Sequence, residues 1–212
     1  MEKYILSVFA GLLILISACS EDSENLNDYI IAGETTPEQT AHYTFDASIN
    51  DQNQNTSISL DLNADGTDDL KLFNQSFEND SVFVRRIGIK ALGNLQLAQE
   101  TNPSDSLHFA DTVSDLYCEQ GAIIDQDHPW QPAGHEAMLE HILIMTTEEG
   151  DHQTTTTTRR ASVSDSSVPY LGFRLYIDNR YHYGWIKLIR SQDSNSTTIS
   201  ISEAAITQVY SD

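Results

Sequence analysis

The feature that most constrains how this chain folds is a period of two in its apolar residues. The clearest case is the segment YLGFRLYI at residues 170–177, which places four apolar side chains on one face: Leu171, Phe173, Leu175 and Ile177. Residues 178–180 have the chemistry of a turn, and the segment YHYGWIKLI at residues 181–189 follows them. Successive side chains of a strand point to opposite faces of a sheet, so this pattern predicts a β-hairpin.

Short segments with the same period recur along the chain, separated by Asn, Asp, Gly and Ser. We expect strands within residues 42–49, 57–62, 70–73, 82–92, 95–97, 196–202 and 204–210. Many short strands joined by polar turns are typical of an antiparallel sandwich or barrel. We therefore expect an all-β fold: an antiparallel, jelly-roll-like β-sandwich over residues 41–212, with at most one short helix besides the N-terminal signal helix.

The central part of the chain is less regular. Residues 134–145 contain four apolar residues at helical spacing, although residues 142–147 fit a buried strand equally well. We expect a short turn or helix there that leads into a strand. Residues 101–115 and 148–167 read as loops, and the second contains five consecutive threonines, which also suit an edge strand.

The first residues have the pattern of a secretory signal. Glu2 and Lys3 precede an apolar run that is shorter than the roughly 18 residues of a spanning helix. The run ends in ISAC at residues 16–19, which resembles the lipobox of bacterial lipoproteins, whose cysteine is acylated and becomes the new N-terminus. The resemblance implies a signal peptide over residues 1–18 and a lipid anchor at Cys19. An ordinary secreted protein with an incidental cysteine is the alternative.

Residues 19–40 are rich in Ser, Asn, Glu and Thr and predict a flexible acidic tether, within which YIIA at residues 29–32 is a candidate strand that docks on the domain. The segment SEDSE at residues 20–24 resembles the export signal that sends lipoproteins of Bacteroidota to the outer face of the outer membrane. The periplasmic face is the alternative location. The formal net charge of −21 argues against nucleic acid or an anionic membrane surface as partners. If Cys19 carries lipid, Cys118 has no partner within the chain, and we expect a buried apolar thiol.

The segment DLNADGTDDL at residues 61–70 gathers oxygen atoms at alternate positions. Side chains at its first, third and fifth positions converge when the chain curls, and Gly66 permits the sharp turn. The seventh residue offers a backbone carbonyl, and the ninth closes the cage. Ca²⁺ prefers several hard oxygen ligands in a flexible geometry, whereas Mg²⁺ prefers a small octahedral site and zinc prefers nitrogen or sulfur. The predicted Ca²⁺ ligands are Asp61, Asn63, Asp65, Thr67 and Asp69.

This spacing matches the first part of an EF-hand loop, but Leu72 stands where the EF-hand has its bidentate Glu. The loop resembles instead the calcium loops of integrin-type FG-GAP repeats and thrombospondin type 3 repeats, which share the pattern D-x-[DN]-x-D-G-x-x-D. A single copy is present, so neither a propeller nor a repeat array follows. The resemblance implies a structural cation. The alternative is a plain hairpin turn, since Asn, Asp and Gly favour turns without any metal.

A second resemblance lies in the C-terminal hairpin. YLGFRL followed by HYGWIKL is similar to a pairing, G-F-x-F … Y-G-W-[IV]-x-[VL], of uncharacterised secreted bacterial proteins, many of which carry such an aspartate loop. It implies no activity. From the residues alone we expect Phe173, Tyr183 and Trp185 in the core or in cross-strand aromatic pairs. We expect Gly172 and Gly184 to sit opposite each other and give the rings room. An aromatic platform for sugars is the alternative.

Three histidines occur near carboxylates in the central region: His128, His135 and His141. Leu139 stands where the H-E-x-x-H pattern requires its second histidine, so the spacing of a metalloprotease fails. We expect surface or loop histidines, and a zinc site from His128, His135 and a carboxylate is the alternative. The chain also lacks the G-x-S-x-G motif of many serine hydrolases.

These patterns together predict a lipid-anchored outer-membrane protein with a calcium-stabilised β-sandwich. We expect a non-catalytic surface module, structural or binding, with protein or glycan as partner. The alternative is a secreted hydrolase that acts on carbohydrate, which requires two facing carboxylates in a cleft away from the aspartate loop. A purely structural surface component without a ligand beyond the ion is a third reading.

Overall fold

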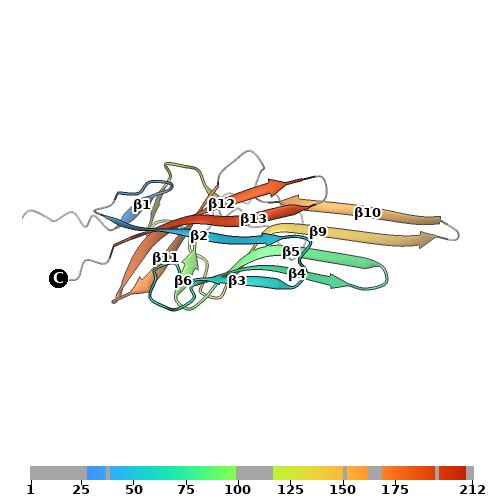
Figure 1. Ribbon diagram of the computed structural model, residues 1–212, viewed down its shortest axis with the longest axis horizontal. Helices are drawn as coiled ribbons and strands as arrows, with labels where there is room; N and C mark the ends of the chain where they lie inside the picture. The colour runs from blue at the N-terminus through green and yellow to red at the C-terminus, as the bar shows by residue number, and fades with distance from the viewer. Residues whose placement is uncertain are drawn as a thin grey trace, which may run out of the picture.

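The structure is a computed structural model that describes residues 28–36, 39–98, 117–149, 152–161, 169–193 and 196–208. Within these ranges every regular element is a strand, and the strands form two large antiparallel sheets and one small sheet (Figure 1). The predicted all-β sandwich is confirmed. The predicted signal peptide, Cys19 and the loop at residues 101–115 lie outside the described residues.

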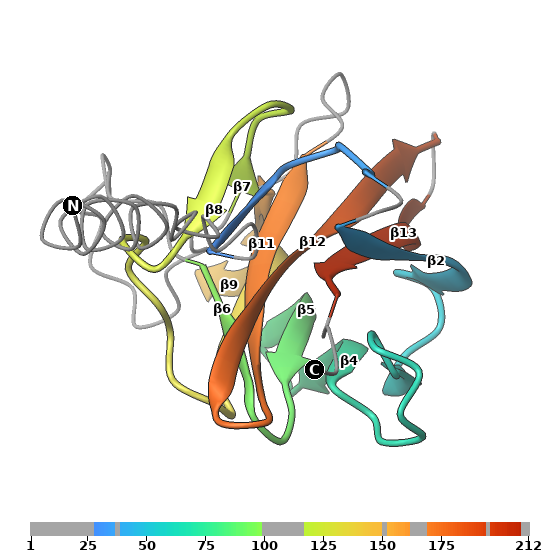
Figure 2. The ribbon, with the colours of Figure 1, turned by 90° about the vertical axis from the view of Figure 1, so that its left-hand side faces the viewer.

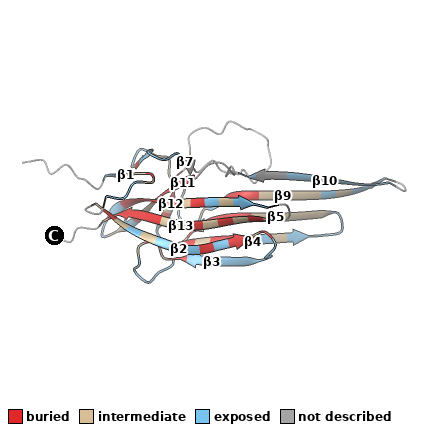
Figure 3. Cartoon of the chain, turned by 45° about the horizontal axis from the view of Figure 1, so that its top comes forward, coloured by how far each residue is buried: buried red, intermediate tan, exposed pale blue. Residues whose placement is uncertain are grey.

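One large sheet has five strands in the order β10-β9-β5-β4-β3. Its strands are β3 (Thr56–Leu60), β4 (Leu70–Glu78), β5 (Val82–Ala91), β9 (Glu136–Glu149) and β10 (His152–Ala161). The first three form a meander, in which Leu70 pairs with Leu60 on one side and with Ala91 on the other. The ends of β4, β9 and β10 project beyond the second sheet, and exposed or half-buried residues gather there (Figure 3).

The other large sheet has the order β2-β13-β12-β11-β6, and β7 pairs with β11. Its strands are β2 (Thr40–Asn50), β6 (Leu95–Leu97), β7 (Tyr117–Cys118), β11 (Tyr170–Ile177), β12 (Arg180–Gln192) and β13 (Thr197–Thr207). The β11–β12 hairpin is confirmed. Its turn residues Asp178 and Asn179 have φ angles of 49° and 64°, in the left-handed region where Asp and Asn are tolerated best.

The connectivity differs from the jelly roll that we expected. Strands β3 to β5 and strands β11 to β13 form two meanders, whereas a jelly roll is built from two Greek keys. β13 also covers two segments that we expected as separate strands. A bulge between Ile201 and Glu203 reverses the alternation there, so one strand reads as two in the sequence.

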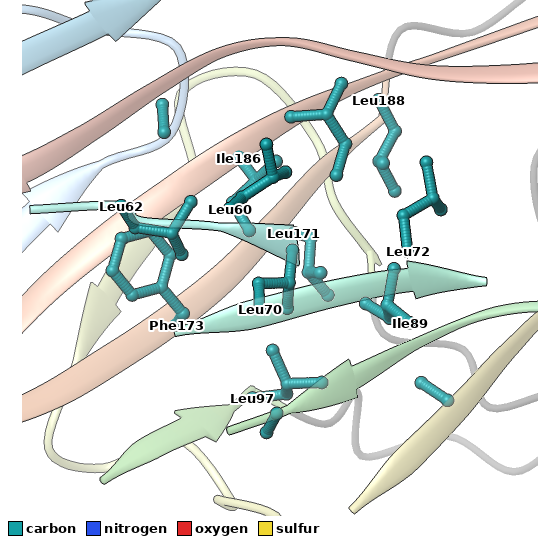
Figure 4. Packing of buried hydrophobic residues seen from close by; sticks show 14 of the residues in the cluster. Leu60, Leu62, Leu70, Leu72, Ile89, Leu97, Leu171, Phe173, Ile186 and Leu188 are labelled. Atoms are coloured by element: carbon teal, nitrogen blue, oxygen red, sulfur yellow. The ribbon is translucent and has the colours of Figure 1, made fainter. Parts of the chain in front are cut away.

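The main core lies between the two large sheets. Leucines from the five-stranded sheet and its loop face apolar side chains of β11 and β12 (Figure 4). The fully buried members labelled in that view include Leu62, Leu70, Leu72, Ile89, Leu97, Leu171, Phe173, Ile186 and Leu188. Each such side chain stabilises the fold by roughly 1.5–3 kcal/mol relative to exposure, so this interlayer contact carries much of the stability.

A second apolar cluster covers the outer face of the six-stranded sheet. β1 (Tyr29–Ile31) pairs with β8 (Ile123–Asp125), and this small sheet lies over β11 and β12 (Figure 2). Ile30 packs there against Trp185, whose indole N–H donates to the carbonyl of Glu34 at 3.1 Å. The docking strand expected at residues 29–32 is confirmed. The predicted tether over residues 19–40 is therefore wrong for residues 29–34, which are part of the fold.

The helix considered at residues 134–145 is wrong, because β9 runs through this stretch. Its helical spacing arises from a register shift opposite Ile87 and Gly88, where Met138 pairs with Gly88 and Glu140 with Ile87. The extra residue, Leu139, brings four consecutive buried residues into the strand. The loop expected at residues 148–167 is wrong at residues 152–161, where the threonine-rich edge strand β10 is found.

Among the described residues, no helix has the length and apolar character to cross a membrane.

Candidate functional site

The aspartate loop, residues 61–69, connects β3 to β4. Leu60 and Leu70 pair at its base, and Leu62 is fully buried in the main core. These three leucines fix where the loop begins and ends. Its polar residues therefore project from one end of the sandwich.

The carboxylate of Asp61 organises the first half of the loop. Its Oδ1 accepts the backbone N–H of Asn63 at 3.3 Å and of Asp65 at 3.2 Å, and its Oδ2 accepts the N–H of Gly66 at 2.7 Å. Three amides that point at one carboxylate require the chain to curl around it. The curl expected from the alternate spacing is therefore present.

Asp65 continues the same arrangement. Its Oδ1 accepts the N–H of Thr67 at 2.8 Å, and its Oδ2 accepts the side-chain amide of Asn63 at 3.0 Å. The hydrogen bond from Asn63, followed by the one from Thr67, holds the pKa of Asp65 below its usual value. Asp65 is therefore a fully ionised carboxylate at neutral pH.

Asp69 is the buried carboxylate of the loop, with 6% of its surface exposed. Its Oδ2 accepts the N–H of Leu62 at 2.9 Å, which closes the loop end to end. Burial raises the pKa of Asp69 to about 6, and the negative charges of Asp65 and Asp61 add to the shift. The loop thus gathers three carboxylates whose charges oppose one another.

The backbone turns sharply between these carboxylates. Ala64 has a φ of 60° and Gly66 a φ of 89°, both in the left-handed region. That conformation costs roughly 1–2 kcal/mol for a residue with a side chain, and glycine avoids the cost. The expectation that Gly66 permits the turn is confirmed.

The loop also contacts both large sheets. The Tyr43 hydroxyl on β2 donates to the carbonyl of Asn63 at 3.0 Å, and the N–H of Leu92, just after β5, donates to the carbonyl of Asp69 at 2.7 Å. Burial, followed by the charge of Asp61, raises the pKa of Tyr43. A group that rigidifies this loop would therefore fix the end of both layers.

Within the described ranges, no group of three or more His, Cys, Asp and Glu side chains is placed to hold a metal ion. In the loop, the carboxylates of Asp61 and Asp65 face backbone amides instead of converging on one point. The donor set still fits Ca²⁺, because the carboxylate oxygens that accept a single N–H, such as Oδ2 of Asp61 and Oδ1 of Asp65, retain a lone pair for a cation. Burial, followed by the charges of Asp65 and Asp61, disfavours the ionised form of Asp69, and a bound cation would offset the part that comes from these two charges.

The three histidines of the central region have different surroundings. His128 contacts Asp125, with Nδ1 3.3 Å from Oδ1, and His135 lies in the connection between β8 and β9. His141 lies within β9, opposite Arg86. Burial lowers the pKa of His135. Because the described residues hold no metal-ligand group, the arrangement does not support the zinc alternative.

Three aromatic residues of the C-terminal hairpin are buried, as expected. Phe173, Tyr183 and Trp185 have 0%, 6% and 1% of their surface exposed, so an aromatic sugar platform built from them is wrong. The expectation that Gly172 and Gly184 face each other is also wrong: Gly172 pairs with Trp185, and Gly184 pairs with Phe173. Gly184 does give an aromatic ring room, as expected, because a side chain at this position would overlap the Phe173 ring.

Cys118 is half-buried beside the second apolar cluster, where we expected a buried thiol.

One cluster was missed from the sequence. The Arg174 guanidinium lies 3.9 Å from the ring centroid of Tyr181 and 4.6 Å from that of Trp130, on the outer face of the six-stranded sheet. Its Nε donates to Gln96 Oε1 at 2.7 Å. Alternation with core residues marks Arg174 as outward-facing, but Trp130 comes from a separate loop and the sequence gives no sign of the contact.

A comparison with protein-family models, curated proteins and solved structures finds no match to this chain.

Proposed function

We propose that this protein is a lipid-anchored outer-membrane protein whose β-sandwich is stabilised by Ca²⁺ in the aspartate loop, and that it acts as a non-catalytic surface module. The observation that carries the proposal is Asp69, a carboxylate that is buried in the loop and brought to a pKa of about 6 by burial and by two neighbouring carboxylates.

The proposed role of the ion follows from the burial of the Asp69 carboxylate beside two other carboxylates. At neutral pH a bound divalent cation offsets the repulsion among Asp61, Asp65 and Asp69 and favours the ionised form of Asp69. The loop contacts Tyr43 on β2 and Leu92 beside β5, so the ion would fasten the ends of both sheets. We assign Asn63 and Thr67 as the remaining ligands, on the spacing of the loop.

The proposed location depends on the lipobox-like segment before Cys19. An acyl chain at Cys19, aided by further acylation, holds a protein stably at a membrane. The acidic residues that follow favour the outer face of the outer membrane over the periplasmic face.

Among the residues that the structure describes, no observation supports the hydrolase alternative. A pocket of about 230 Å³ lies over β4 and β5. Among the described residues that line it, the single carboxylate is Glu136, which pairs with Lys90 at 2.8 Å. Glycoside hydrolysis needs two carboxyl groups across the scissile bond, so this pocket supports binding better than hydrolysis.

Thermal unfolding of the full chain in a non-ionic detergent tests the proposal. After chelation, the midpoint is compared with and without added Ca²⁺, in the wild type and in the variant Asp61→Ala/Asp65→Ala. A cation that binds the folded state at 100 times its dissociation constant stabilises it by about 2.7 kcal/mol, which raises the midpoint by several degrees. A calcium-specific rise that is absent in the variant supports the proposal, and an unchanged wild-type midpoint contradicts it.

A further inference from the structure

We propose that the outer face of the five-stranded sheet binds an acidic polysaccharide along a basic groove. This inference rests on the proposed function, since it names the ligand class of the surface module. The basic groove is defined by six residues of β4 and β5: Lys71, Phe73, Gln75, Phe77, Arg86 and Lys90.

Strand alternation places these side chains on the outer face. On β4, Leu70 and Leu72 point into the main core, so Lys71 and Phe73 point away from it. On β5, Ile87 and Ile89 point into the core, so Arg86 and Lys90 point outward. Two adjoining pockets of about 230 and 410 Å³ follow this face, and they share Asn55 and Gln75 as lining residues. The two pockets therefore lie next to each other along β4, and together they are called the groove.

The register brings like charges together in the groove. Lys71 lies directly opposite Lys90, and Gln75 lies opposite Arg86. Like charges directly opposite each other on a sheet destabilise it unless an anion offsets them. Glu136 pairs with Lys90 at 2.8 Å, whereas no ion pair in the described part of the chain includes Lys71.

This local positive charge stands against the charge of the whole molecule. The chain has 32 acidic residues and 11 Lys and Arg, yet Lys71 and Lys90 lie side by side in the groove, with Glu136 as the one carboxylate among the described residues that line its first pocket. At about 0.15 M salt the screening length is about 8 Å, so a ligand in the groove experiences these cations more than the distant carboxylates. Charge complementarity therefore favours an anionic ligand.

The remaining lining favours a sugar over an acidic peptide. Asn55, Thr56, Ser57 and Gln75 supply amide and hydroxyl groups for a ligand rich in hydroxyls. Phe77 keeps 62% of its surface exposed at one end of the groove, and a flat ring suits the C–H face of a sugar. Phe73 forms the floor, because its ring lies over Gly88, where a side chain would come within 2.7 Å of it.

The groove adjoins the aspartate loop in the chain. Thr56 and Ser57 come from β3 and Lys71 comes from β4, the two strands that the loop connects. Ca²⁺ in the loop would hold the β3–β4 hairpin in register, and with it the side of the groove that Thr56, Ser57 and Lys71 form. The groove itself contains none of the predicted calcium ligands, so the two proposals can fail separately.

Binding is measured with the full chain in non-ionic detergent, at saturating Ca²⁺ and about 0.15 M salt. The probes are dextran sulfate and a short oligogalacturonate as acidic sugars, neutral dextran as the uncharged sugar, and poly-L-glutamate as the anion without sugar. The variants are Lys71→Gln/Arg86→Gln and Phe77→Ala. The variant Arg180→Gln/Lys187→Gln makes the same charge change on the six-stranded sheet and is the matched control.

We expect binding of at least one acidic sugar, a preference for it over both neutral dextran and poly-L-glutamate, and a loss of about tenfold in the groove variants but not in the control. A sulfate-only or carboxylate-only preference identifies the anionic group. Unfolding midpoints within about 2 °C of the wild type show that the variants are folded. Absence of binding, equal binding of poly-L-glutamate, or equal losses in the control variant would overturn the proposal.

The same measurements separate this inference from the proposed calcium site. One outcome is that the groove residues are needed for acidic-sugar binding but Ca²⁺ does not stabilise the protein. This outcome supports the groove proposal and overturns the calcium-site proposal. Stabilisation by Ca²⁺ without binding of any acidic sugar retains the calcium site and overturns the groove.

Discussion

The carboxylate of Asp69 accepts the backbone N–H of Leu62 at 2.9 Å and closes the aspartate loop on itself. Leu62 is fully buried in the main core, so the bond attaches the most buried charge of the loop to the apolar centre of the sandwich. A carboxylate in such a place destabilises the fold when it ionises unless a cation is near. The loop therefore connects the ionisation of one residue to the stability of the domain.

We expect the substitution Asp69→Asn to change stability in opposite directions without and with Ca²⁺. The pKa of Asp69 is raised to about 6 in the folded state, above its unfolded value, so the folded state binds more protons between about pH 4 and pH 6. Without Ca²⁺, the contribution of Asp69 to stability thus falls as the pH rises through this window. At pH 7.5 in chelator we expect Asp69→Asn to stabilise the protein by about 1 to 3 kcal/mol.

With Ca²⁺ at the same pH we expect Asp69→Asn to destabilise the protein, because a ligand is lost. Urea unfolding at pH 5 and pH 7.5, in chelator and in Ca²⁺, measures both effects. Asp68→Asn is the matched control, since Asp68 is the exposed neighbour with the same charge. An equal response of the two variants in all four conditions would rule out a special role for Asp69.

Replacement of Gly184 by Ala is expected to destabilise the protein by about 2 kcal/mol or more. An added Cβ would overlap Cζ of Phe173 and lie 2.6 Å from the carbonyl oxygen of Ala205. Phe173 is buried in the main core and Ala205 in the second apolar cluster, so neither residue moves without loss of packing. Urea unfolding of Gly184→Ala checks the value. In a cycle with Phe173→Leu, which shortens the ring, the two changes should be non-additive, and additive effects would contradict the contact.

Replacement of Cys19 by Ala is expected to release the protein from the membrane fraction, because the lipid anchor is lost. Cells that produce the wild type or the variant are labelled with an alkyne fatty acid and fractionated, and the label is followed on the protein. Cys118→Ala, the other cysteine of the chain, should keep both label and membrane fraction. Equal labelling of the Cys19 variant and the wild type would exclude acylation at Cys19.

Features that depend on one segment at a time are predictable from this sequence. The period of two in residues 170–177 predicts a strand and its buried face, and Leu171, Phe173 and Leu175 are buried on that face. The curl of the aspartate loop is predictable for the same reason, since Asp61 and Asp65 organise backbone amides within five residues of themselves.

Features that depend on the pairing of distant segments were not predictable. The helical spacing in β9 comes from a bulge, and a bulge is defined by the partner strand β5. The offset between Gly172 and Gly184 is set by the two-residue turn at Asp178 and Asn179, and a shift of one residue changes every pair. The sequence shows Lys71, Arg86 and Lys90 as separate cations. Only the pairing register of β4 with β5 places Lys71 beside Lys90.

Calorimetric titration of Ca²⁺ into the chelated full chain tests the central claim most directly. It is performed in about 0.15 M salt with excess Mg²⁺, which suppresses weak binding to the acidic surface. We predict one saturable site in the wild type and in Asp68→Asn, and loss of that site in Asp61→Ala/Asp65→Ala. A wild type without a saturable site, or a double variant that retains it, would contradict the account and leave the loop as a turn.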